Sequence, residues 1–186
     1  MGDRRPDKNQ DTLFSHFRAV ARSDSDYPAE LGKLTDAPDR LYAIGKLPRG
    51  PMVAIVCSRN ADHAAKKLAS RLAFDLTTQG IVIVSGGALG IDTSAHQGAL
   101  QADGPTVAVI GSGFHFPYPK ENRPLFEKIS RQGALVTEFA PEQPPTPWTF
   151  PKRNRLVAAL AGAVVVVQAG AKSGALITAK IAAKQR

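Results

Sequence analysis

The sequence is poor in cysteine and has no long apolar run. Its one cysteine, Cys57, excludes an internal disulfide and a metal site built from several cysteines, and it fits a reducing compartment. No apolar run approaches the about 18 residues that a membrane-spanning helix needs, and no charged-then-apolar leader resembles a secretory signal. We therefore expect a cytoplasmic protein without a membrane partner.

Two common nucleotide-binding motifs are absent as well. There is no G-x-x-x-x-G-K-[ST] pattern, so Walker-type nucleotide hydrolysis has no support. The glycine-rich turn at 85–90 lacks the first glycine of the dinucleotide fingerprint, and Gly111 stands where an acid would hold a ribose. Hydride chemistry is therefore not expected, and we predict neither a cofactor nor a metal.

Positive charge is in excess and is unevenly distributed. The formal net charge is +8, of which residues 1–50 carry +1 and residues 51–186 carry +7. This distribution suits a domain that binds a polyanion. A solvated basic face, or one that docks a protein, would have the same composition.

The central stretch of the chain, residues 80–96, predicts a strand, a tight turn and the start of a helix. A β-branched run ends in Ser85-Gly86-Gly87, and a segment with helical spacing follows, with Asp92 placed as its cap. Glycines let the backbone approach a ligand closely, and the first turn of a helix favours negative charge. The stretch is typical of an anion site; the alternative is a purely structural turn.

A regular alternation of strands and helices predicts the fold. Apolar runs of strand length occur at 52–56, 81–84, 106–110, 134–137 and 163–167. Helical patterns occupy 61–78, 93–102, 122–131, 153–160 and 173–184. Strands that are apolar throughout and separated by helices indicate an open, mostly parallel, doubly wound α/β sheet.

Three parts of the chain differ in character. Residues 1–10 are polar, and we expect them to be disordered. Residues 11–50 predict an N-terminal flap, with a short amphipathic helix from 11 to 21 and an extended piece near 41–45. Residues 51–186 form the predicted α/β domain. In it the linker 140–151 carries five prolines and should be extended and stiff.

The predicted strand ends carry residues suited to phosphate. Ligands of such sheets bind beyond the carboxyl ends of the strands, and there the chain places Ser58 with Arg59, the turn Ser85-Gly86-Gly87, and the segment from Lys172 through Ser173 to Gly174. We interpret these ends as one continuous phosphate-binding crevice.

Aromatic residues beside cations point to single-stranded nucleic acid. Trp148 and Phe150 lie next to a basic run that consists of Lys152, Arg153, Asn154 and Arg155. Aromatic faces suit bases, and cations suit the backbone. Alternatively, the two rings pin the proline-rich linker to the core. Asp92, His96, His115 and Glu138 could act in acid–base chemistry, but a cap, a helix face and a strand-end acceptor explain them better.

Together these motifs resemble the DprA/Smf family of DNA-processing proteins. The match covers about residues 27–186 and is carried by the following segments: Tyr27-Pro28, Val53–Arg59, Ser85–Asp92 with Ala95-His96, Gly111-Ser112-Gly113 with Tyr118-Pro119, Phe150–Arg155 and Ser173–Ala179. The resemblance implies an extended Rossmann-like domain that binds single-stranded DNA and is not an enzyme. It further implies a role in DNA uptake and natural transformation, in which the protein protects incoming single-stranded DNA and loads the RecA recombinase, and a homodimer.

The resemblance also assigns roles to residues. By position, Arg59 would contact phosphate, and Phe150 would stack on a base. The glycine turn at Ser85, Gly86 and Gly87 and the last loop at Lys172, Ser173 and Gly174 would add donors, and Arg153 and Arg155 would line the pocket.

The sequence departs from the family pattern at several places. Cys57 replaces a frequent glycine, and no lysine directly precedes Phe150, so Trp148 would substitute by stacking. The chain stops at Arg186, where relatives continue into further sheet.

One alternative function belongs to a different class of proteins, which bind or hydrolyse nucleotides. The glycine turn is similar to that of lysine-decarboxylase-like phosphoribohydrolases and their nucleotide-binding relatives. Their P-G-G-x-G-T signature and the glutamate that follows it are absent here. Such an activity would need another acid, and Glu138 is the one available.

Overall fold

The computed structural model describes residues 12–56, 61–168 and 174–184. Its centre is a seven-stranded sheet in the order β1-β2-β6-β5-β4-β3-β7. The five strands β3 to β7 are mutually parallel. Strand β2 pairs antiparallel with β6, and β1 pairs antiparallel with β2 at the edge of the sheet. The strand bounds are β1 Arg18–Ala21, β2 Arg40–Gly45, β3 Met52–Val56, β4 Val82–Ser85, β5 Thr106–Val109, β6 Ala134–Thr137 and β7 Ala163–Val166.

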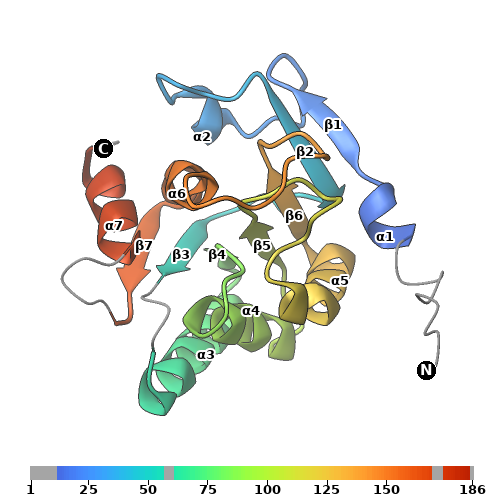
Figure 1. The fold of residues 1–186 in the computed structure, drawn as a ribbon. Coiled ribbons are helices and arrows are strands. Elements are labelled where there is room, and N and C mark those ends of the chain that lie inside the picture. Colours follow the sequence, from blue (N-terminus) through green and yellow to red (C-terminus); the bar gives the residue numbers. More distant parts are fainter. Residues whose placement is uncertain (1–11, 57–60, 169–173, 185–186) are drawn as a thin grey trace, which may run out of the picture.

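Helices cover both faces of the sheet, as Figure 1 shows. One face carries α3 (His63–Thr78), α4 (Ile91–Gln101) and α5 (Arg123–Gln132), which the short turn η1 (Lys120–Asn122) precedes. The other face carries α2 (Ala29–Gly32), α6 (Thr149–Leu160) and α7 (Gly174–Lys184). The predicted doubly wound α/β fold is therefore confirmed, with a mostly parallel sheet between two helical layers.

The core explains why these segments become strands. All residues of β4, β5 and β6 are buried, as expected for central parallel strands whose two faces both meet helices. The side chains of β7, the last strand of the described sheet, are half-buried or exposed. The predicted apolar runs coincide with β3 to β7 to within one or two residues at each end.

The N-terminal flap departs from the helical pattern. The helix that we predict from 11 to 21 is present only as α1 (Thr12–Ser15), and Arg18–Ala21 is instead strand β1, paired with β2. Apolar residues at 13, 14, 17, 20 and 21 suit a helical period, but Val20 alone of the strand is fully buried. The open edge of β2 offers backbone hydrogen bonds to this segment, and that pairing overrides the local pattern.

The proline-rich linker ends earlier than we predict. Helix α6 begins at Thr149 rather than near Arg153, so Phe150 and Lys152 lie in its first turn. Pro151 is compatible with this, because the first-turn N–H groups have no partner within the helix. The helix thus delivers its aromatic and basic residues from a rigid element at the carboxyl edge of the sheet.

Candidate nucleic-acid interface

The connections after β4, β5 and β6 and the start of α6 lie at the same edge of the sheet, because parallel strands all end there. We call this region the carboxyl-edge site. Four predicted site residues, namely Ser58, Arg59, Lys172 and Ser173, lie outside the described residues. The other ten lie on elements that meet at this edge, namely Ser85, Gly86, Gly87, Trp148, Phe150, Lys152, Arg153, Asn154, Arg155 and Gly174.

The glycine turn follows β4 and is tightly held. The Ser85 hydroxyl is buried and donates to the Ile55 carbonyl over 2.6 Å, so this side chain ties β4 to β3. Gly87 has φ +71°, and a Cβ there would come within 2.8 Å of the Phe126 ring. The turn therefore requires glycine at 87 for both conformation and space.

Asp92 closes this turn instead of capping the helix. Helix α4 begins at Ile91 with Gly90 at the N-cap, and the buried Asp92 carboxylate accepts a hydrogen bond of 3.2 Å from the Ala88 N–H. Burial raises the pKa of the Asp92 carboxyl, and the nearby positive charge of Arg153 opposes that shift. The cap that we predict is thus corrected to a bond that shapes the turn.

Arg153 lies beneath the glycine turn. Its side chain is only 5% exposed, and its guanidinium donates to the carbonyls of Gly86 and Val109. A Cβ at Gly86 would overlap this guanidinium. The sequence suggests a cation that lines the crevice; the structure places this charge behind the turn, where it joins the ends of β4 and β5.

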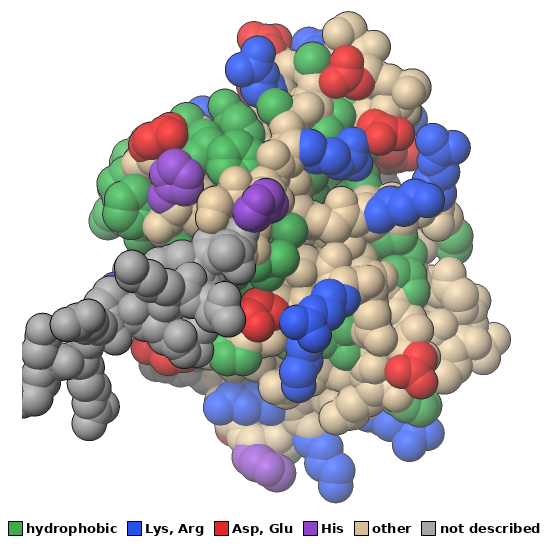
Figure 2. All heavy atoms as spheres, turned by 90° about the vertical axis from the view of Figure 1, so that its right-hand side faces the viewer, with side chains coloured by type: hydrophobic (Ala, Val, Ile, Leu, Met, Phe, Trp, Pro, Cys, Tyr) green, Lys and Arg blue, Asp and Glu red, His purple; other side chains and the backbone are tan. Residues whose placement is uncertain are grey.

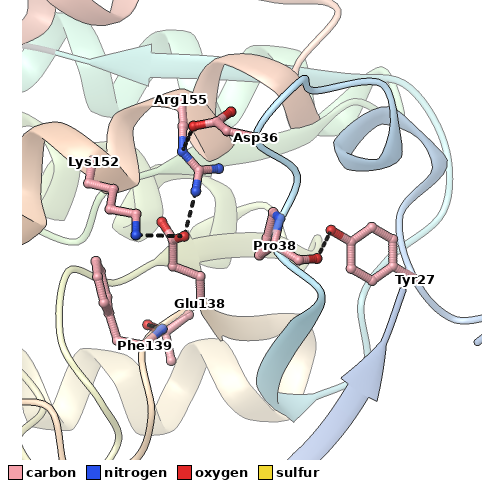
Figure 3. Close-up of polar contacts among 8 residues, drawn as sticks. Tyr27, Asp36, Pro38, Glu138, Phe139, Lys152 and Arg155 are labelled. Atoms are coloured by element: carbon pink, nitrogen blue, oxygen red, sulfur yellow. Dashed lines mark hydrogen bonds and ion pairs between the residues drawn. The ribbon is translucent and has the colours of Figure 1, made fainter. Parts of the chain in front are cut away.

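A second buried cation connects the edge to the flap (Figure 3). Arg155 pairs with Glu138 after β6 over 2.5 Å and with Asp36 of the flap over 2.9 Å. Tyr27 donates to the Pro38 carbonyl over 2.7 Å, which holds the same stretch of the flap. Arg155 therefore fastens the flap to α6 and β6.

Two cations, Arg155 and Lys152, lie close to the Glu138 carboxylate. Its side chain is 6% exposed, and Lys152 Nζ lies 3.8 Å from the oxygen that also meets Arg155. Burial raises the pKa of the Glu138 carboxyl, while Arg155 and Lys152 lower it. The predicted role as a strand-end acceptor agrees with these contacts.

One exposed and one buried aromatic ring lie close to the remaining cation of this group. Trp148 is 53% exposed, and Lys152 Nζ lies 5.7 Å from the centre of its ring and 5.8 Å from that of Phe139. The rings of Phe139 and Trp148 meet edge to face at 5.6 Å. Lys152 thus presents its charge above an aromatic pair, in the range of a cation–π interaction.

Phe150 belongs to a second aromatic group, which sequence reasoning missed in part. Its half-buried ring lies 5.6 Å from that of Tyr118, and a Cβ at Gly111 would come within 2.8 Å of it. Tyr118 and Phe116 are each 46% exposed. Their position directly after an apolar run, at a predicted strand end, is the signal that could have placed them in the site.

Asn154 connects α6 to the start of α7, since its Nδ2 lies 3.5 Å from the Gly174 carbonyl. The contact brings two of the predicted residues together at the loop that follows β7.

His96 lies in the core, away from the exposed surface of the site. His96 is fully buried, and its Nδ1 lies 2.8 Å from the Thr106 hydroxyl, which itself donates to the Ile83 carbonyl. Burial lowers the pKa of His96 to about 3, so its ring is neutral near pH 7. Within the described ranges, His, Cys, Asp and Glu do not gather in groups of three or more that could hold a metal ion.

Comparison with known proteins places the chain in a family. The family model described as DNA recombination-mediator protein A matches residues 18–186. The chain belongs to this family. DNA processing protein DprA of Bacillus subtilis is 39% identical over 172 residues, which are 91% of this chain and 58% of that protein. The chain spans about half the length of the curated DprA and Smf relatives that it matches.

Solved DprA structures agree with the fold. DprA from Streptococcus pneumoniae matches with a TM-score of 0.86 and 38% identity, over 93% of this chain and 62% of that one. DNA processing protein A from Helicobacter pylori, described for its single-stranded DNA binding mode, matches with a TM-score of 0.82 and 34% identity, over 92% and 79% of the two chains.

A more distant likeness concerns the fold alone. The molybdenum cofactor binding protein of Rippkaea orientalis matches with a TM-score of 0.55 at 22% identity, over 73% of this chain and 72% of that one. The Rossmann-like architecture of the DprA family therefore also occurs in proteins outside the family.

Among the described helices, none combines the length and hydrophobicity that crossing a bilayer requires.

Proposed function

We propose that this chain binds single-stranded DNA at the carboxyl-edge site. One observation carries the proposal: Trp148, Tyr118 and Phe116 are exposed at the ligand-binding edge of a doubly wound sheet, and Lys152 lies over the Trp148 ring. Exposed rings offer stacking surfaces to unpaired bases, and a cation over one of them suits the phosphate backbone. Large apolar groups exposed together in this way favour a binding surface over a solvated face.

The described residues divide into two groups in this proposal. Trp148, Phe150 and Lys152 touch the DNA, whereas Gly86 and Gly87 are buried and shape the turn beside them. Ser85, Arg153 and Arg155 hold the contacting segments in place, because their polar groups already bond within the protein.

The loops after β3 and β7 complete the proposed site. In the sequence, Ser58 and Arg59 follow β3, and Lys172 and Ser173 precede α7. Asn154 contacts Gly174, the first residue of α7. Hydroxyls, cations and backbone N–H groups at these positions suit phosphate oxygens.

Membership of the DprA family supports a wider role. We propose that the protein acts in DNA uptake and natural transformation in the cytoplasm, where it protects incoming single-stranded DNA and loads RecA, as a homodimer. This role is not enzymatic. Single-stranded DNA binding by a family structure, described for Helicobacter pylori, is its nearest support.

A nucleotide-hydrolysing function of the phosphoribohydrolase type has weaker support. It would need Glu138 as the acid, and this side chain is 6% exposed and pairs with Arg155 and Lys152. These contacts suit a structural acceptor better than a group that approaches a sugar.

Fluorescence anisotropy tests the proposal. We expect a labelled oligothymidine to bind more tightly than a duplex of equal length, with the logarithm of affinity falling by about 0.7 per neutralised phosphate for each unit of log salt. Equal binding of duplex and single strand, or no binding at low salt, would contradict the proposal.

A further inference from the structure

A large cleft lies at the opposite edge of the sheet, where the parallel strands begin. We call it the amino-edge cleft. It has a volume of about 1140 Å³, and its walls are flap residues 25–30, the connection 46–50 between β2 and β3, and the end of α5. Met52, which opens β3, and Leu160, which ends α6, also line it. The cleft is therefore separate from the carboxyl-edge site.

Four exposed cations line this cleft, namely Arg18, Lys46, Arg49 and Arg131. Arg18 pairs with Asp26 over 2.8 Å, whereas the other three form no ion pair within the described part of the chain. Like charges that are not neutralised repel one another. Their concentration in one hollow, with only Asp26 and Glu30 as acidic lining residues, suits an anionic ligand.

The backbone holds two of these cations close to each other. Gly45 ends β2 with φ +84°, and a Cβ there would overlap the carbonyl oxygens of Ser130 and Gly133. The next residue, Lys46, donates its N–H to the Gly133 carbonyl over 3.0 Å. Because β2 is pressed in this way against the end of α5, Lys46 and Arg131 border the same space.

The size and lining of the cleft indicate a chain-like ligand. Its volume of about 1140 Å³ lies at the upper end of the about 300–1,000 Å³ of small-molecule sites. Between the cations lie the apolar residues Leu47, Pro48, Met52 and Leu160. Cations beside an apolar floor suit a polymer with regularly spaced phosphates, bound through its backbone without base-specific hydrogen bonds.

The flap reaches from the cleft to the carboxyl-edge site. Tyr27 and Glu30 line the cleft, whereas Asp36 pairs with Arg155 at the other edge. Lys33, between them in sequence, is exposed. In Figure 1, α2 of the flap lies on the same side of the sheet as α6, and Figure 2 shows Lys and Arg side chains, with acidic ones among them, on the face on the side of β1 and α5.

We propose that the amino-edge cleft is a second site for the backbone of single-stranded DNA, reached only by strands long enough to extend past the flap from the carboxyl-edge site. The inference rests on the proposed function of the carboxyl-edge site and adds the path that the DNA takes when it leaves that site.

The test compares two oligothymidines under DNA excess, so that each strand holds at most one protein. One has about 8 nucleotides, within the range of a single site, and the other about 30, enough for both. Charge reversal by Lys46→Glu, Arg49→Glu and Arg131→Glu should weaken binding of the long strand and lower its log–log salt slope by about 2. Binding of the short strand should stay unchanged.

A matched triple variant controls for net charge. Lys66→Glu, Lys67→Glu and Lys180→Glu change three cations that are exposed on α3 and α7 and lie outside the cleft. An equal loss in this variant would overturn the inference, because the effect would then be one of total charge.

Acylation of lysines in the unmodified protein gives an independent measurement that does not depend on the folding of a variant. The long strand should protect Lys46 from acylation, and the short strand should not. The second site would be overturned if Lys46 is acylated equally fast in the presence of the short and the long strand. It would also be overturned if charge reversal leaves binding of the long strand unchanged, and the cleft would then suit an acidic protein segment. Failure of the short strand to bind at all would contradict the function of the carboxyl-edge site itself.

Discussion

The guanidinium of Arg153 lies beneath the glycine turn, and both the turn and the end of β5 depend on it. It donates to the carbonyls of Gly86 and Val109 from a position that is 5% exposed. Unpaired buried carbonyls are costly, so the cation stabilises two strand ends from inside. A basic residue can thus serve a nucleic-acid site by shaping the backbone that faces the ligand.

Gly86 and Arg153 should therefore be energetically coupled. Gly86→Ala places a methyl group against the guanidinium and should cost about 1–3 kcal/mol of unfolding free energy. Arg153→Ala should cost about 1–3 kcal/mol for each carbonyl left without a donor. In the double variant the methyl occupies space that the arginine has left, so urea denaturation should show a loss smaller than the sum. Additive losses would contradict the close packing of these two residues.

Trp148 should contribute to DNA binding and little to folding. Its ring is 53% exposed, so Trp148→Ala should leave the unfolding midpoint nearly unchanged while weakening oligothymidine binding by about 1–3 kcal/mol. Leu68→Ala, which removes an equally exposed apolar side chain from α3, is the matched control and should leave binding unchanged. If unfolding shifts and binding does not, Trp148 serves to anchor the linker.

At the scale of elements, the flap and α6 are joined through Arg155. Its contact with Asp36 involves a carboxylate that is 62% exposed, whereas its contact with Glu138 involves one that is 6% exposed. Exposed pairs contribute little, and breaking a buried pair leaves an uncompensated charge. The two contacts should therefore respond very differently to substitution.

Arg155→Ala should destabilise the protein by about 3–5 kcal/mol, because Glu138 then stays buried with only Lys152 at 3.8 Å. Asp36→Asn should cost less than about 1 kcal/mol. Amide hydrogen exchange should show faster opening of residues 27–38 in Arg155→Ala than in Asp36→Asn. Exchange of these residues that is unchanged from the unmodified protein in both variants would mean that Arg155 does not hold the flap.

Sequence patterns predict some of these elements and not others. Strands β3 to β7 are visible because central parallel strands are apolar throughout. Strand β1 is not visible in the sequence, because its apolar spacing also fits a helix. Pairing with the open edge of β2 is what makes this segment a strand. Helix α6 begins earlier than predicted, since Pro151 marks a linker in sequence but is tolerated in a first turn.

The same limit applies to the candidate site. The loops that form it follow from the strand ends, and the exposed Trp148 and Lys152 lie where the aromatic and basic residues suggest. The burial of Arg153 depends on space that Gly86 leaves 67 positions away, which local pattern does not reveal. Likewise, Arg155 meets Asp36 only because the flap folds back over α6.

At the scale of the whole molecule, the fold separates stability from binding. Buried polar contacts such as Ser85 to Ile55 and Arg155 to Glu138 fasten elements to one another, while exposed rings and cations lie at the sheet edges. A net charge of +8 acts over the entire surface, so it attracts any polyanion. In the proposed function, the contacts at the carboxyl-edge site localise the DNA.

The emission of Trp148 tests that localisation most directly, because it is the one tryptophan in the sequence and its exposed ring lies within the proposed site. Titration with oligothymidine should quench this emission, and the change should saturate at the same DNA concentration as the anisotropy of a labelled strand, since a stacked base alters the ring's surroundings. Binding by anisotropy with unchanged Trp148 emission would place the DNA elsewhere on the molecule and contradict the account.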